Sequence, residues 1–218
     1  MKKNVCLFFL IAVGVLAILS SGTIASAQAG LTAAEMALER GNGFLLSGDL
    51  DRALAEYTQA ITLDPNFAMA YSNRGIIYGF KGDHNRAIAE HTHAIRLDPA
   101  YFRAYINRAY TYIEIGDYDR AIADCNLAIR LDPNNAQAYH NRGSAYMGKN
   151  DYDQAITDST QAIRLNPNYV EAYMCRALAY YNKGDSGRAI ADWEAVLRID
   201  PNHAGARQNI EIVQELAR

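Results

Sequence analysis

The sequence has little excess charge of either sign and few cysteines. Its 218 residues include 21 lysines and arginines against 24 acidic residues, a formal net charge of −3. A protein that holds nucleic acid by its phosphates needs a basic surface, so nucleic acid is not expected as a partner. The three cysteines, Cys6, Cys125 and Cys175, are too few for a disulfide framework. Cys125 and Cys175 are expected to be small, buried side chains.

Long apolar runs are also lacking, except for one at the N-terminus. Lys2 and Lys3 precede an apolar run at 5–19, and Ala25-Ser26-Ala27 follows it. This order is typical of a secretory signal peptide and predicts a signal at 1–27, with a linker at 28–33. A helix of that run would span ~22 Å, which is shorter than the ~30 Å hydrocarbon core of a bilayer. The sequence therefore predicts an exported protein, periplasmic or secreted. The alternative is a protein anchored to the membrane by an uncleaved N-terminal segment.

Prolines are scarce, and their spacing gives the organisation of the chain. All five fall 34 residues apart, at Pro65, Pro99, Pro133, Pro167 and Pro201. A fixed period of this length is typical of helical solenoids. It predicts five units followed by a capping helix at 204–218. The units are 34–67, 68–101, 102–135, 136–169 and 170–203, and repeat positions are numbered from 1 to 34 within each.

Each unit is predicted to be two helices joined by a short turn at repeat position 15. Glycine, or asparagine as second choice, accepts the left-handed conformation that ends a helix. This position holds Gly48, Gly82, Gly116, Asn150 and Gly184. An aspartate follows in every unit, and it is suited to cap the second helix. Thr32 and Glu35 fit a capping box at the start of the first helix.

Small residues at positions 8 and 20, aromatic residues at 11 and proline at 32 complete the pattern. With these features the chain resembles the tetratricopeptide repeat family over 34–203. The resemblance implies an all-α fold, a right-handed superhelical solenoid of five helical hairpins plus a C-terminal cap helix. The first helix of each hairpin would line a concave groove.

An arginine stands at position 7 of every unit, and an acid at position 23. A partly buried guanidinium needs such a partner, so these residues are expected to form a structural ladder within or between the repeats.

No segment remains for a catalytic domain or a glycine-rich phosphate loop. The protein is therefore predicted not to be an enzyme and to use no cofactor. His91 and His93 point in different directions on a helix, and His84 and His91 share a face without an acidic third ligand. No metal site is predicted.

The resemblance places positions 2, 5, 9, 12 and 13 on the concave face, and more than half of these carry bulky apolar residues. Exposed apolar surface of that extent marks a partner site. Asn42, Asn73 and Asn107 are expected to bond to backbone in the groove. The predicted partner-binding residues are Phe80, Arg103, Ile106, Tyr110, Ile113, Tyr181, Asn73, Asn107 and Asn141. Coverage by neighbouring helices and self-association are the alternatives.

The predicted function is that of a protein–protein interaction scaffold or adaptor that holds a segment of a partner protein or peptide in this groove. The alternative is an accessory ligand- or substrate-binding subunit of a cell-envelope enzyme complex. A membrane would be contacted only through an uncleaved signal peptide.

Overall fold

The computed structural model describes residues 31–216. The predicted signal peptide (1–27), the first half of the predicted linker (28–30) and the last two residues of the predicted cap lie outside the described residues.

Residues 31–216 form eleven α-helices and no strand. The helices are α2 (Ala33–Leu46), α3 (Leu50–Leu63), α4 (Ala68–Phe80), α5 (His84–Leu97), α6 (Phe102–Glu114), α7 (Tyr118–Leu131), α8 (Ala136–Gly148), α9 (Tyr152–Leu165), α10 (Val170–Asn182), α11 (Ser186–Ile199) and α12 (Ala204–Leu216). The even-numbered helices from α2 to α10 are the first helices of the units, and the odd-numbered ones from α3 to α11 are the second helices.

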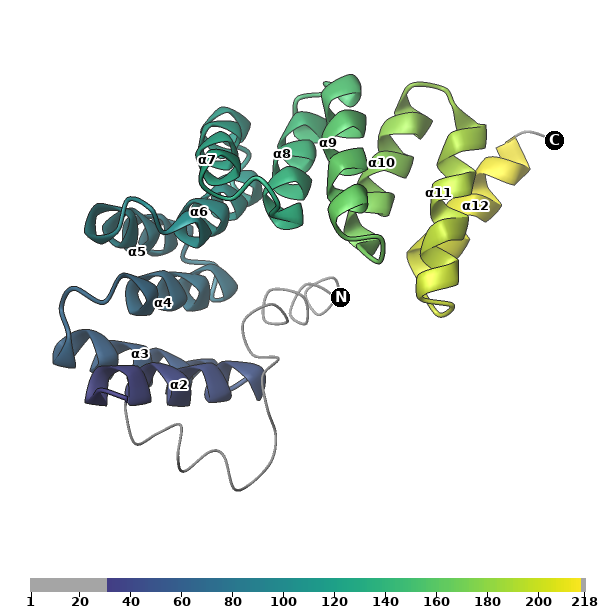
Figure 1. Cartoon of the computed structure of the whole chain (residues 1–218). Coiled ribbons are helices and arrows are strands. Elements are labelled where there is room, and N and C mark those ends of the chain that lie inside the picture. Colours follow the sequence, from purple (N-terminus) through teal and green to yellow (C-terminus); the bar gives the residue numbers. More distant parts are fainter. Residues whose placement is uncertain (1–30, 217–218) are drawn as a thin grey trace.

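The helices stack in chain order and form an arc (Figure 1). Each first helix packs on its own second helix, and each second helix packs on the first helix of the next unit. Figure 1 shows α4 and α6 on the inner side of the arc, and α5 and α7 on its outer side. The predicted all-helical repeat solenoid is confirmed.

The turns inside the hairpins have the predicted backbone chemistry. Gly48, Gly82, Gly116 and Gly184 have φ between 78° and 81°, and Asn150 has φ 60°. This is the left-handed region that glycine and asparagine tolerate best. The aspartate that follows accepts a hydrogen bond from a backbone N–H in the first turn of the second helix in all five units. Thr32 and Glu35 form the expected capping box.

The core is a series of small clusters that neighbouring units share. In the first cluster, Ala37 and Leu38 of α2 pack with Tyr57 of α3 and with Ile77 of α4. A Cβ added to Gly41 would lie 2.6 Å from the ring of Tyr57, so the small residue at position 8 lets the two helices approach closely. Because each cluster takes residues from the next unit, no hairpin completes its core alone.

The last unit is covered by α12. Val213 and Ala206 of α12 are buried, and they share a cluster with Trp193 and Val196 of α11. This helix therefore covers the apolar surface that a sixth unit would otherwise cover.

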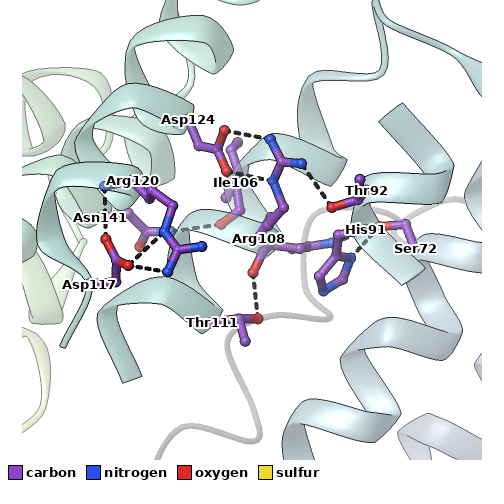
Figure 2. A network of polar contacts seen from close by, with 11 residues as sticks. Ser72, His91, Thr92, Ile106, Arg108, Thr111, Asp117, Arg120, Asp124 and Asn141 are labelled. Carbon is purple, nitrogen blue, oxygen red and sulfur yellow. Dashed lines mark hydrogen bonds and ion pairs between the residues drawn. The ribbon is translucent and has the colours of Figure 1, made fainter. Parts of the chain in front are cut away.

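Four of the five arginines at position 7 join three helices each, as Figure 2 shows for Arg108. Arg108 of α6 donates from Nε and Nη2 to the two carboxylate oxygens of Asp124 on α7, both at 2.8 Å. Its Nη1 donates to the hydroxyl of Thr92 on α5, in the preceding unit, at 2.9 Å. The same arrangement recurs at Arg142 and Arg176. The ladder therefore has its ion pairs within the units and additional hydrogen bonds between them.

Replacing Arg108 with alanine is expected to lower the free energy of unfolding by about 3 kcal/mol, because it leaves a buried carboxylate without its partner. The side chain of Asp124 is only 6% exposed. Urea denaturation followed by circular dichroism measures the loss.

The matched control is Arg130→Ala, which removes an exposed arginine from the next helix and should change stability by less than about 0.5 kcal/mol. An Arg108→Ala protein with unaltered unfolding that no longer binds its partner would show that Arg108 is a ligand-binding residue instead.

Candidate functional site

The candidate site is the concave face, defined as positions 2, 5, 9, 12 and 13 of the first helices together with the asparagines at position 6. Four apolar side chains of this face are exposed by more than a third. They are Leu46 (51%), Met69 (38%), Leu178 (39%) and Tyr181 (37%). They come from α2, α4 and α10, so exposed apolar surface is present in units at both ends of the array.

Two of the predicted site residues are buried, and the expectation that they line an exposed surface is wrong. Ile106 is 2% exposed and Asn141 is 3% exposed. Ile106 packs in a cluster with Ala128 of α7 and Ala138 of α8. The small side chain of Ala138 allows α8 to come close to α6 and cover Ile106. Asn141, one turn further along α8, donates from Nδ2 to the backbone carbonyl of Ile106 at 3.3 Å.

The remaining apolar residues of the predicted site are only partly accessible. Phe80 packs against the first core cluster, and Ile113 packs against a cluster that contains Ala109 and Tyr112. Tyr110 is half-buried. Tyr181 lies near the ring of Trp193, with ring centroids 6.2 Å apart. Neighbouring helices therefore cover part of the apolar surface that the sequence indicates.

Arg103 is the exposed cation of the predicted site. It stands in the first turn of α6, where its guanidinium lies 5.8 Å from the ring centroid of Phe102. Among the ion pairs of residues 31–216, none involves Arg103.

Two asparagines of the predicted site join adjacent first helices. Asn73 of α4 donates from Nδ2 to Oδ1 of Asn42 on α2 at 3.0 Å. Asn107 of α6 donates from Nδ2 to the hydroxyl of Ser72 on α4 at 3.1 Å. The predicted bonding of Asn42, Asn73 and Asn107 to backbone is not found in these bonds, whose partners are side chains. The asparagines thus fix the spacing of the first helices along the concave face.

One of these bonds continues into the core (Figure 2). The hydroxyl of Ser72 lies 3.3 Å from Nδ1 of His91, a side chain of α5 that is 1% exposed. Burial lowers the pKa of His91 to about 3, and the positive charge of Arg108 adds to this effect. Burial also lowers the pKa of His140, on α8, to about 4. Both histidines are therefore neutral at pH 7.

Sequence reasoning missed Ser72 and His91 because each stands at a position whose residue type changes from unit to unit. It also missed Ile115, which follows α6 and is 43% exposed. Its position 14 holds a lysine in three other units, and these form ion pairs with an aspartate of the preceding unit: Lys81–Asp51, Lys149–Asp119 and Lys183–Asp153. Isoleucine in place of lysine at position 14 was the sequence signal that could have identified Ile115.

Cys125 and Cys175 are free and buried, as expected, and burial raises the pKa of both thiols. Within residues 31–216, no group of three or more His, Cys, Asp or Glu side chains is placed to hold a metal ion. In the same range, no helix has the length and apolar character needed to cross a membrane.

Comparison with family models identifies the protein family to which the chain belongs. Models described as tetratricopeptide repeat match residues 68–101, 102–135, 125–157 and 170–203, and one described as TPR repeat matches 41–79 and 143–184. Together the matches run from 41 to 203 without a gap. The chain belongs to the tetratricopeptide repeat (TPR) family.

Solved structures share the fold. A thermophilic TPR protein from Thermus thermophilus is 21% identical, with a TM-score of 0.72 over 84% of this chain and 99% of that one. MamA from Desulfovibrio magneticus RS-1 is 20% identical, with a TM-score of 0.66 over 78% and 97%. YrrB, described as a TPR protein with an unusual peptide-binding site, is 21% identical, with a TM-score of 0.61 over 87% and 97%. No curated protein matches the sequence. At these identities the likeness shows the fold alone.

The buried histidines predict a loss of stability in mild acid. Their folded-state pKa values lie below the ~6.5 of an unfolded histidine, so the unfolded chain takes up more protons as the pH falls. The contribution of the two histidines to stability is therefore fully present above pH ~6.5. As the pH falls from 6.5 to 4, each histidine should lower the free energy of unfolding by about 1.4 kcal/mol per pH unit.

The measurement is urea denaturation of the wild type and of a His91→Gln, His140→Gln variant across this pH range. The variant should have a shallower pH dependence, because glutamine does not titrate. Equal slopes for the two proteins would contradict the assignment of the acid sensitivity to these histidines.

Proposed function

We propose that this protein is an interaction scaffold that binds an extended or helical segment of a partner protein along its concave face. The observation that carries the proposal is the exposure of Leu46, Met69, Leu178 and Tyr181 on first helices of the array. Apolar side chains that stay exposed in a folded chain gain free energy when a partner removes them from water.

The asparagines can contribute directional contacts beside these apolar residues. A primary amide has two N–H donors and a carbonyl acceptor. Asn73 and Asn107, both half-buried, use one N–H each for the neighbouring helix. The remaining capacity of the two amides suits the backbone of a bound segment. Asn141 and Ile106 support this face from beneath and do not line it.

The fold relatives support a peptide ligand in a general way. One of them, YrrB, is described as having a peptide-binding site. The role of an accessory substrate-binding subunit of an envelope enzyme stays a prediction, and no contact within the described residues favours it over a scaffold.

The test is a comparison of peptide binding by the wild type and by a Met69→Ser, Leu178→Ser variant. Peptides are first selected on the wild-type protein from a displayed random library, and their affinities are then measured by isothermal titration calorimetry. The variant should bind the selected peptides at least about tenfold more weakly, because interface side chains of this kind contribute more than ~1 kcal/mol each when they are central.

The matched control is Leu63→Ser, Ile212→Ser, which removes two exposed apolar side chains (47% and 43%) from α3 and α12. The control should bind as the wild type does. If the concave-face variant keeps wild-type affinity for every selected peptide, the proposal is wrong.

We also propose that the protein acts after export. Lys2 and Lys3, the apolar run at 5–19 and Ala25-Ser26-Ala27 support this. Expression of the full chain in a bacterium with a general secretion pathway should yield a mature protein that begins at Gln28, as measured by intact mass. A variant with Ala25→Tyr and Ala27→Tyr should keep its full length. A full-length wild-type protein in the membrane fraction would favour the anchored alternative.

A further inference from the structure

Apart from Arg103, the arginines of the repeats fall into three sets, and one set has no acidic partner. Arginines at position 7 pair with the acid at position 23 of the same unit. Arginines at position 19 pair with the capping aspartate in four units. Those at position 29 form none of the ion pairs found within residues 31–216. They are Arg96, Arg130, Arg164 and Arg198, and we call them the arginine row.

All four members of the arginine row are exposed, and all lie in the last turn of a second helix. Because they occupy the same position in consecutive units, they follow one another along the array. The second helices that carry neighbouring members each pack on the first helix that lies between them in the chain.

The acids nearest in sequence are occupied by the backbone. Asp98 accepts a hydrogen bond from the N–H of Ala100 at 2.9 Å, and Asp200 accepts one from the N–H of Asn202 at 3.0 Å. Asp132 accepts one from the N–H of Asn134 at 3.2 Å. These carboxylates build the turns between the units instead of pairing with the row.

The arginines themselves use little of their hydrogen-bonding capacity. Arg96 bonds through Nη2 with Nδ1 of His93 at 2.7 Å, and Arg164 donates from Nε to Oε1 of Gln161 at 3.0 Å. A guanidinium has five N–H donors and binds a carboxylate through two of them at once. Each member of the row therefore keeps a free edge for an acid.

The C-terminal end of the row opens on a hollow in the surface. A cavity of about 680 Å³ is lined by Arg198, Ile199 and Ala195 of α11, by Tyr173 of α10, and by Pro167 and Asn168. Beside Arg130, Leu131 is 43% exposed. Apolar surface next to the guanidinium groups suits an acidic segment that also carries apolar side chains.

We propose that the arginine row binds an acidic, extended segment of a partner protein. The complementarity is local, since the chain as a whole carries a net charge of −3 and does not attract anions generally. In a polyproline II segment, which has three residues per turn, every third side chain points the same way, so acids at every third residue would face the line of arginines together.

The shape of the array favours a polypeptide over a lipid surface. The axes of α5, α7, α9 and α11 change direction along the arc (Figure 1). The row therefore follows a curved path, which a flexible segment can trace and a flat bilayer cannot. A positive charge in the last turn of a helix also stabilises that helix, and thermal unfolding in the test below measures this contribution separately.

The test uses two fluorescein-labelled fifteen-residue peptides, one with glutamate at every third position and one with glutamine in its place. Fluorescence anisotropy measures their binding to the full mature protein. The glutamate peptide should bind more tightly than the glutamine peptide, and its affinity should fall as salt is raised. An Arg130→Gln, Arg164→Gln variant should lose about tenfold in affinity for the glutamate peptide, since each exposed charged contact is worth up to ~1 kcal/mol.

The matched control is Arg120→Gln, Arg188→Gln, which removes the same charge from two exposed arginines outside the row and outside the concave face. The control should bind the glutamate peptide as the wild type does, with all three proteins melting within a few degrees of one another. Equal losses in control and row variants would show a response to net charge alone and overturn the proposal.

Two further arms identify the class of ligand and separate this surface from the concave face. The proposal would also be overturned if the protein bound phosphatidylglycerol vesicles or single-stranded DNA through the arginine row and did not bind the glutamate peptide. The Met69→Ser, Leu178→Ser variant should bind the glutamate peptide normally. If it does not, the peptide binds at the concave face and the arginine row is not its site.

Discussion

The guanidinium of an arginine at position 7 makes its complete set of hydrogen bonds only when it contacts two second helices. These are the second helix of its own unit and that of the preceding unit. Arg142 shows the full set, with Asp158 on α9 and Asn126 on α7. The first unit has no predecessor, and there Arg40 pairs with Glu56 alone. Its side chain is 53% exposed, against 16% for Arg108 and 21% for Arg142. The shared core and the shared guanidinium both make each unit depend on its neighbour, and this dependence holds the arc together.

The contacts between units recur along the array, whereas the residue type at the centre of each hairpin varies. Position 24 is buried in every unit although it holds Tyr57, His91, Cys125, Ser159 and Trp193. A small residue at position 8 lies over it, and a Cβ on Gly75 would meet the ring of His91 at 2.7 Å. The polar residue at this position in the second unit, His91, has an effect outside the core. It bonds to the hydroxyl of Ser72, which accepts a hydrogen bond from Nδ2 of Asn107. The chemistry of the concave face is therefore connected to the identity of a core residue.

The hairpins could be predicted from the sequence because their signals are local. Proline, glycine and aspartate at fixed positions set the ends of the helices through backbone geometry, and no distant residue is needed to interpret them. Exposure on the concave face could not be predicted in the same way. Ile106 occupies a position that the repeat directs toward the inner face, but Ala138 of the next unit lets α8 cover it. Leu38 and Ser72, at the same repeat position, are buried too, so accessibility there depends on how the next unit packs, which helical periodicity alone does not reveal.

A repeat also decides what kind of surface is available for binding. Any residue left unpaired in one unit tends to be left unpaired in its neighbours, so accessible groups form lines along the array instead of compact pockets. On the concave face these are apolar side chains and half-used amides. At the ends of the second helices they are the arginines of position 29, because the acids of position 31 accept hydrogen bonds from backbone N–H groups of the turns. A single exposed ion pair contributes at most ~1 kcal/mol. Contacts made by one connected segment add, since the first contact holds the others at high effective concentration. Recognition by such a chain therefore depends on the spacing of groups in the partner more than on any single residue of the scaffold.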